Sequence, residues 1–529
     1  MNPAVPPRRA AALPLAFAAA LLAFSLLPRV RQYPPLVWSI AGAALLLMTW
    51  GAALFVRSRR SGRILSLYFA LRPQHYVQAC AHASIFLYWG WYWPPVYDAA
   101  VLIVAQIIFA YAFDMLLVWS RRDVYTLGFG PFPIVFSMNL FLWFKQEWFF
   151  WQFLMIAVAF TGKALLQWEK GGRPAHIFNP SALALTVMSL GLLVTGTTDA
   201  TWGREIAITQ FYPPQMYLFL FVVSLPGQIL FGVTSMTLAA VASTYLFGLA
   251  YFALTGTYFF IDSYVPIAVF LGMHLLFTDP STSPRTDLGR LMFGTVYGLS
   301  VVGLYGLLTA AGSPTFYDKL LQVPFMNLSV RHFDRLAGWP ALQRFGPENV
   351  WRRLTGYRRN LAYVCVWGIV FGIMSATGGL GDQHPGQWLP FWQDACRQNR
   401  AGACSHVEQF ETTLCRAGSG WACNELGILR FERNAERMGA LASWQRGCEI
   451  GFSPACANAG DGGGRRAAPN VTDYPILLRG SKGPIANLAE EALYDRACRQ
   501  SWIDACIRKR EGSPGSGYSH PAQAPRRDP

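Results

Sequence analysis

Apolar stretches of nearly membrane-spanning length follow one another over residues 1–377, and each ends at glycine, proline or charged residues. An α-helix of about 20 apolar residues crosses the hydrocarbon core of a bilayer. The pattern therefore predicts a polytopic helical bundle of about 10–12 spans. The candidate spans are Ala11–Leu27, Leu36–Val56, Tyr76–Trp93, Ala99–Trp119, Trp148–Leu166, Ser181–Thr195, Met216–Phe231, Met236–Leu254, Val265–Phe277, Leu291–Ala310 and Leu361–Ser375.

Two apolar stretches need their own interpretation. The first candidate span follows two arginines, as a signal peptide does, but Arg29 flanks it and many spans come after it. We therefore expect an uncleaved first helix. The stretch Pro133–Phe144 is short and precedes Lys145 and Glu147. We expect it to form a half-helix that enters and leaves the membrane on one side.

Polarity changes after residue 377, because residues 378–529 are polar and rich in glycine and cysteine. We expect an all-α protein in four parts. These are an N-terminal transmembrane hairpin over 1–64, a membrane domain over 65–377, a helical-repeat domain over 378–510 and a disordered tail over 511–529.

The net charge of +15 comes with only 14% charged residues. Basic residues crowd the loops beside the spans and lack a nucleic-acid recognition fold, so we expect a lipid membrane as partner and no nucleic acid. With the N-terminus inside and a half-helix at Pro133–Phe144, the basic loop 312–360 lies inside. Thr234 and all residues after Ser375 then lie outside. If the half-helix crosses instead, the later half inverts, which the charges disfavour.

Eight of the ten cysteines follow residue 390, in four pairs with seven residues between the members of each. Zinc sites usually show tighter pairs. Regular spacing and an even number indicate disulfides in an oxidising compartment, with reduced core cysteines as the alternative. We therefore expect a multi-pass protein of a bacterial inner (plasma) membrane with an extracytoplasmic C-terminal domain. The pairs are Cys396/Cys404, Cys415/Cys423, Cys448/Cys456 and Cys498/Cys506.

The C-terminal sequence also repeats, since the stretches that begin at Cys415 and Cys448 are similar and start 33 residues apart. That period is typical of stacked helical hairpins. Residues 390–510 resemble cysteine-rich Sel-one-like repeats, which are relatives of tetratricopeptide repeats in which a disulfide staples two antiparallel helices. The resemblance implies a protein partner on the repeats, because such arrays present concave binding surfaces.

Two polar, helix-breaking segments stand at the ends of apolar stretches in the membrane domain. The first reads HIFNPSA over His176–Ala182. Asn179 suits the N-cap of a helix and Pro180 its first turn. Such a helix start points N–H groups at an anion or carbonyl, and His176 would add a donor. Plain helix capping is the alternative.

The second segment reads TDPSTSPR from Thr278 to Arg285. Thr278 supplies a hydroxyl, and Asp279 would cap a helix or bind polar ligand atoms. Arg285 suits a phosphate or a carboxylate. A well-capped polar turn between two spans is the alternative here.

The order and spacing of HIFNPSA and TDPxxSPxxxxGRxxFG carry a family resemblance. They resemble the D subunit of the Rnf electron-transport complex and the B subunit of the sodium-translocating NADH:quinone reductase, and most of all the UnbU-type membrane proteins of enediyne gene clusters. The resemblance covers residues 65–375. It implies a flavin-bearing membrane redox protein built from two inverted halves, with FMN or another flavin, or a quinone, as cofactor and with redox partner subunits.

In those subunits FMN is joined by a phosphoester to the threonine of PGxxGETS on the outer face. The similar segment here is Pro226–Ser235, which makes Thr234 the implied attachment residue. Val233 replaces the acidic neighbour, and two extra residues precede Gly232. An ordinary threonine at a helix turn is therefore the alternative.

Four ionisable residues stand within the apolar stretches: His82, Asp114, Lys163 and His274. Such residues are functional candidates in a membrane, as haem ligands or as a proton or ion path. The resemblance implies a subunit of an electron-transport oxidoreductase. A small-solute transporter or channel of the same fold and a membrane-anchored scaffold that acts through its repeats are the alternatives.

Overall fold

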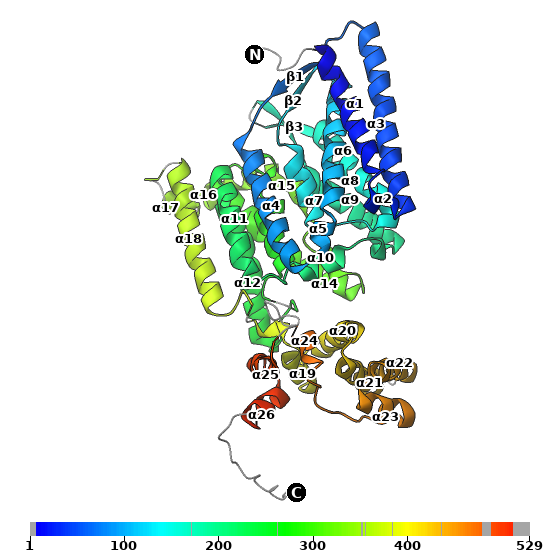
Figure 1. Ribbon diagram of the computed structural model, residues 1–529. Helices are drawn as coiled ribbons and strands as arrows, with labels where there is room; N and C mark the ends of the chain where they lie inside the picture. Colours follow the sequence, from blue (N-terminus) through cyan, green and yellow to red (C-terminus); the bar gives the residue numbers. More distant parts are fainter. Residues whose placement is uncertain are drawn as a thin grey trace, which may run out of the picture. The chain divides into compact units, whose positions relative to one another are not determined.

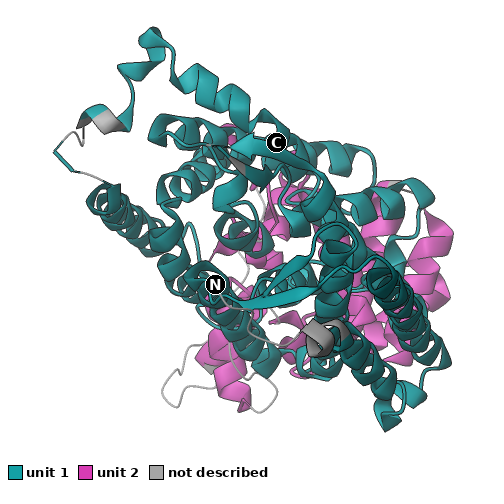
Figure 2. Cartoon of the chain, turned by 90° about the horizontal axis from the view of Figure 1, so that it is seen from above, with its two compact units in different colours: residues 1–250, 264–381 teal, residues 251–263, 382–529 magenta. Residues whose placement is uncertain are grey.

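The computed structural model describes residues 7–170, 172–261, 263–350, 353–354, 356–382, 384–434, 436–478 and 488–511. The chain divides into two compact units (Figure 2). Unit 1 comprises residues 1–250 and 264–381, and unit 2 comprises residues 251–263 and 382–529. Both are built from α-helices. The expected tail at 511–529 lies outside the described residues except for Glu511.

Helices coincide with every predicted span (Figure 1). Within the described residues, five are long and apolar enough to cross a membrane by themselves: α3 (Pro34–Arg60), α6 (Ala100–Trp119), α12 (Thr234–Thr255), α14 (Asp287–Ala310) and α18 (Gly356–Ala376). The other predicted spans form α1 (Pro7–Phe24), α4 (Pro73–Tyr92), α8 (Phe150–Leu165), α9 (Pro180–Thr195), α11 (Met216–Phe231) and α13 (Ile267–Leu271), the last continued by a π-helical turn over Gly272–Leu276.

Shorter elements connect these helices. They are α2 (Pro28–Arg31), α5 (Pro95–Asp98), α7 (Pro131–Asn139), α10 (Gly203–Thr209), α15 (Val323–Ala337), α16 (Pro340–Gln343) and α17 (Pro347–Val350), with 3-10 turns η1 (Gln146–Trp148), η2 (Thr198–Ala200), η4 (Pro280–Thr282) and η5 (Thr315–Tyr317).

The fold is helical as expected, and the described residues also include two small sheets. Strands β1 (Ser66–Phe69) and β2 (Val124–Leu127) pair in parallel, with Ser66 opposite Val124. Strands β3 (Gln167–Lys170) and β4 (Arg173–His176) form an antiparallel hairpin, with Gln167 opposite His176. Each strand has only four residues, too few for its alternation to stand out in the sequence.

One end of unit 1 collects the basic loops, and we call it the basic end. Arg63 forms an ion pair with Asp123 at 2.7 Å, and Arg121 donates to the carbonyl of Ala164 at the close of α8. Lys170 of β3, directly after α8, bonds the second polar segment. Arg290 and Arg359 both pair with Asp287 at the start of α14. Loops that are distant in the sequence thus share one end.

The stretch Pro133–Phe144 does not form a half-helix that returns to its own side. Helix α7 starts at the basic end, where Gly130 lies against His75, and closes at Asn139. The chain then runs on without a helix until Phe144 pairs with Thr201, beyond the far end of α9. Residues 131–149 therefore traverse unit 1. Helix α7 has nine residues, so its length alone is too short for a span.

Buried glutamines make this irregular traverse tolerable. Gln152 accepts a hydrogen bond from the backbone N–H of Phe144 at 3.1 Å, and Gln210 donates to the carbonyl of Leu140. The side chain of Asn139 bonds Gln106 of α6 in both directions. Non-helical backbone that is buried needs such partners, because an unpaired buried backbone group is costly.

Unit 2 contains short helices: α19 (Leu389–Arg397), α20 (Ala403–Arg416), α21 (Gly420–Asn434), α22 (Arg437–Glu449), α23 (Ser453–Asp461), α24 (Tyr474–Leu477), α25 (Glu490–Arg499), α26 (Ile503–Glu511) and the turn η6 (Pro385–Gln387). Four disulfides join neighbouring helices, and each joins the two members of one predicted pair: Cys396–Cys404, Cys415–Cys423, Cys448–Cys456 and Cys498–Cys506. The disulfide prediction is confirmed. Trp444 packs with Ile428 and Ala440 in the core between α21 and α22.

Candidate functional site

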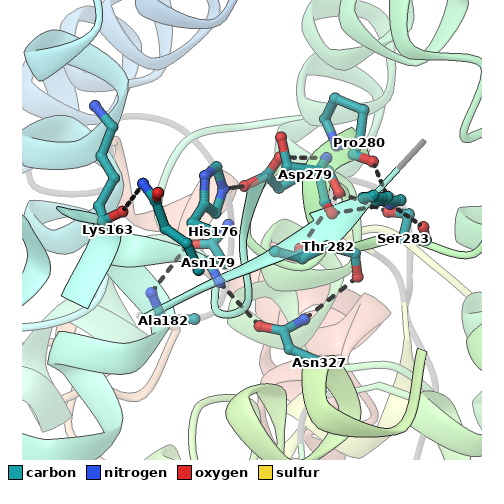
Figure 3. A network of polar contacts seen from close by, with 12 residues as sticks. Lys163, His176, Asn179, Ala182, Asp279, Pro280, Thr282, Ser283 and Asn327 are labelled. Carbon is teal, nitrogen blue, oxygen red and sulfur yellow. Dashed lines mark hydrogen bonds and ion pairs between the residues drawn. The ribbon is translucent and has the colours of Figure 1, made fainter. Parts of the chain in front are cut away.

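The first polar segment starts helix α9 as the sequence predicts. The Asn179 side chain accepts the N–H of Ala182 at 3.0 Å, which is an N-cap bond. The same side chain donates to the carbonyl of Leu276 at 2.9 Å, at the end of the π-helical turn. Its backbone N–H donates to Asn327 of α15. Asn179 therefore caps one helix and holds two other elements beside it (Figure 3).

His176 and Asp279 join the two polar segments directly. The His176 Nε2 atom lies 2.8 Å from Asp279 Oδ2, and both side chains remain less than one-fifth exposed. Asp279 also accepts the N–H of Ser281 at 2.8 Å as the cap of η4. Burial alone would raise the pKa of Asp279. The charge and hydrogen bond of His176, the Ser281 N–H and the charge of Lys170 outweigh it, so this pKa lies below its usual range.

Lys170 closes the junction from the β3–β4 hairpin. Its Nζ donates to the carbonyls of Pro280, Ser281 and Ser283 at 3.2, 2.8 and 2.8 Å. Burial lowers the pKa of Lys170, and nearby Asp334 and Asp279 oppose that shift. An ammonium group that faces three carbonyl oxygens uses all three of its donors. The loop is therefore fixed by an amine that the motif search did not select.

Arg290 links the second polar segment to the turn between α11 and α12. Its Nε donates to the carbonyl of Pro284 at 3.0 Å, and its Nη1 donates to that of Gly232 at 2.6 Å. Arg285 behaves differently, because its backbone N–H bonds Asp334 while its side chain is exposed. A guanidinium in that position is available to an anion from solvent.

Thr234 lies near this junction, at the basic end, whereas the span count put it opposite the basic loops. That expectation was wrong. For the loop 57–63 the reason is that residues 131–149 traverse unit 1, and for the loop 312–360 it is that residues 316–327 traverse it as well, from Gly203 to Asn179. Thr234 is 0% exposed, and its hydroxyl has no hydrogen-bond partner among the described residues. The same holds for Ser235 and Thr237, which are also in the first turn of α12. Three buried hydroxyls without partners therefore stand at one helix start.

The structure brings together most of the predicted site residues. His176, Asn179 and Asp279 lie in one hydrogen-bonded junction, and Arg285 lies at its edge. Thr278 does not bond across it, since its hydroxyl donates to the carbonyl of His274 in the preceding turn. The sequence analysis missed Lys170, Asn327, Asp334 and Arg359. Each stands outside the two motifs, and only the helix packing shows its role.

The two segments also lie at the same end of unit 1. Two segments related by an inverted repeat would lie at opposite ends, so these two are not an inverted pair. Of the ionisable residues within the apolar stretches, Asp114 accepts a hydrogen bond from Tyr125 at 3.0 Å. The Nζ atom of Lys163 stands over the ring of Phe160.

No family model matches the chain, and no curated protein or solved structure shows a significant match to it.

Proposed function

We propose that this protein is an integral membrane redox protein that takes part in flavin- or quinone-linked electron transfer, as the Rnf D subunit does. One observation carries the proposal. The three segments that bear the resemblance, HIFNPSA, TDPxxSP and the Pro226–Ser235 stretch, converge on one junction through His176–Asp279 and Arg290–Gly232. Segments with unrelated roles would not need to meet.

The groups around the α12 start suit the phosphate of a flavin nucleotide. The hydroxyls of Thr234, Ser235 and Thr237 lack partners among the described residues, and the positive end of the helix dipole lies beside them. Arg290 donates a hydrogen bond to the carbonyl of Gly232, which precedes Thr234 by two residues. A bound flavin would supply transfer of one or two electrons. The chain itself would hold the phosphate and fix the polar segments around it.

Covalent attachment at Thr234 fits less well than non-covalent binding. The Thr234 hydroxyl is fully buried, so a phosphoester there would require the turn between α11 and α12 to open. Under the positive-inside rule the basic end faces the cytoplasm. Thr234 would then lie on the inner side, away from an attaching enzyme that works on the outer face. The proposal is therefore a flavin or quinone held without a covalent bond.

The absorption spectrum and mass of the purified protein test this proposal. We expect flavin or quinone that is released by denaturation, with unmodified mass for the peptide that contains Thr234. Arg290→Gln should lower the cofactor content, whereas Arg344→Gln, an exposed arginine outside the junction, should not. A protein that never carries either cofactor would contradict the redox assignment. A Thr234 peptide heavier by one FMN would contradict non-covalent binding.

We also propose that the basic end is cytoplasmic and that unit 2 is extracytoplasmic, where it docks a protein partner through its repeats. The disulfides of unit 2 support this location, because such bonds persist in oxidising compartments. In a variant without the free cysteines Cys80 and Cys365, one new cysteine is introduced at the exposed position Arg344 or Arg397. Its labelling reports the side of the membrane on which that position lies. A membrane-impermeant thiol reagent should label Arg397→Cys in intact spheroplasts and Arg344→Cys only after lysis.

Transport of a small solute is a second candidate, and interrupted helices favour it. The traverse of unit 1 is interrupted over residues 140–145, which form no helix, and α13 passes into a π-helical turn. Transporters build their binding sites from such interruptions. Flux of a solute through liposomes that contain the protein and no redox partner would support this candidate. Cofactor-dependent electron transfer without flux would favour the first.

A further inference from the structure

A small, partly enclosed cavity lies in unit 1 between α4, α11 and the π-helical turn. Its volume is about 10 Å³, close to the smallest space that holds one water molecule. Its polar lining comes from Gln78, Ser224, Gln228, His274 and Thr278, and apolar side chains complete the wall. None of the motifs in the sequence pointed to this cavity.

The π-helical turn determines which nitrogen of His274 carries hydrogen. His274 Nδ1 lies 2.7 Å from the carbonyl oxygen of Phe270. A carbonyl oxygen only accepts, so Nδ1 must carry the proton and Nε2 of the neutral ring is left with a lone pair. That Nε2 atom is buried and has no partner among the described residues. The ring also stacks on Trp367, which restricts its rotation.

Gln228 presents a second acceptor to the cavity. Its Nε2 donates to Ser224 Oγ at 3.0 Å, and Ser224 Oγ donates in turn to the carbonyl of Phe221. The Oε1 atom of Gln228 is left buried without a partner in the described part of the chain. Thr278 uses its hydroxyl hydrogen on the carbonyl of His274. The hydrogens of His274, Ser224 and Thr278 are used in these bonds, so these three groups can only accept inside the cavity, and the Oε1 atom of Gln228 is a further acceptor.

We propose that the cavity binds one water molecule, which donates one hydrogen to His274 Nε2 and the other to Gln228 Oε1. A water molecule has two donors for two orphaned acceptors, and the space admits little more than a water. Such a water satisfies two buried polar atoms that would otherwise destabilise the fold. It also makes His274 an internal proton-exchange position beneath the Thr278–Asp279 loop. The proposal stands independently of flavin or quinone binding.

Solid-state NMR of the full-length protein in lipid bilayers, with ¹⁵N-labelled histidine, tests this site. His274→Phe assigns the signal. We expect His274 to be protonated at Nδ1 and to receive magnetisation from water. His82 is the internal comparison, because both of its ring nitrogens are buried without partners in the described structure and it does not line the cavity. His82 should receive much less magnetisation.

Gln228→Leu removes one of the two acceptors and should lower the water occupancy about fivefold to tenfold, the equilibrium equivalent of one hydrogen bond. Gln322→Leu is the matched control, since Gln322 is also buried without side-chain partners among the described residues but lies outside the cavity lining. It should leave the His274 signal unchanged.

Two results would overturn the proposal. One is water transfer to His274 that is no faster than transfer to His82. The other is a proton on Nε2, because a protonated Nε2 cannot accept a hydrogen from water. Both are read from the protein without substitution in the cavity, so they remain decisive if Gln228→Leu fails to fold.

Discussion

The two units of this chain stabilise their helical folds in different ways. Unit 1 uses long apolar helices and confines much of its charge to the loops at their ends, and its cysteines Cys80 and Cys365 are free. Unit 2 uses helices of at most 15 residues and fastens neighbouring ones with four disulfides. Disulfides stabilise a fold by restricting its unfolded chain, and they persist in oxidising compartments. Long apolar helices do not need them.

The units also differ in how they bury carboxylates. Asp279 of unit 1 is paired with His176, and its pKa is lowered. Glu411 of unit 2 is buried with one hydrogen bond from Gln393, and its Oε2 has no partner among the described residues. Burial raises the pKa of Glu411 well above its usual value. The two groups therefore give the units opposite dependence of stability on pH.

Loss of one disulfide is expected to have the largest effect, and only in unit 2. Replacing Cys415 and Cys423 with serine removes a restraint on the unfolded chain, which typically destabilises a fold by about 2–4 kcal/mol. Hydrogen exchange with mass spectrometry on the full-length protein should show faster exchange in α20 and α21 and no change in α6 or α14. Serine at Cys80 and Cys365 is the control and should leave both units unchanged. Equal loss of protection in both units would show that they do not fold separately.

Asn179→Ala should have the next largest effect, and it should be confined to unit 1. The substitution removes the cap bond to Ala182 and the bond to Leu276, together worth about 2 kcal/mol. Exchange should speed up at the start of α9 and along α13. Thr195→Ala, at the exposed far end of the same helix, serves as the control and should cost much less. Unaltered exchange at the start of α9 would mean that the junction does not stabilise unit 1.

Glu411→Gln should stabilise unit 2 at high pH. A carboxyl whose folded pKa is raised favours the folded state below its unfolded pKa and loses that stability as the pH rises towards the folded value. The variant should therefore gain about 1 kcal/mol at pH 8 and nothing at pH 4, measured by thermal unfolding. Glu408→Gln is the comparison, since Glu408 is only partly buried and pairs with Arg430. Glu408→Gln should lose a little stability at pH 8. If it gained as much stability there as Glu411→Gln, burial would not be the cause of the effect at Glu411.

Asp279→Asn should have the smallest effect and the opposite pH window. A carboxyl with a lowered folded pKa stabilises the fold above its unfolded pKa, near 3.8, and loses this contribution as the pH falls through the folded value. The variant should be less stable than the parent at pH 7, by about 1 kcal/mol or less, and the difference should vanish at the acid end. Thermal unfolding of unit 1 between pH 3 and 7 measures this. A difference that is constant over the range would exclude ionisation as its source.

The sequence by itself determined the parts whose causes are local. Apolar stretches place the helices, because a long apolar segment satisfies its backbone hydrogen bonds within one helix. The spacing of the cysteines predicted all four disulfides, since each bridge joins residues only eight apart. Asn179 before Pro180 predicted the start of α9, because an N-cap is decided within four residues. The resemblance to electron-transport subunits still rests on the motifs.

Only the tertiary structure decided which residues meet. The path of residues 131–149 depends on Gln152 and Gln210, which lie elsewhere in the chain and satisfy its irregular backbone. That path moved Thr234 to the basic end. Lys170 and Arg290 join the polar segments through contacts across more than 50 residues, which no local pattern records. The His274 cavity has the same origin, because three packed elements together leave two acceptors unpaired.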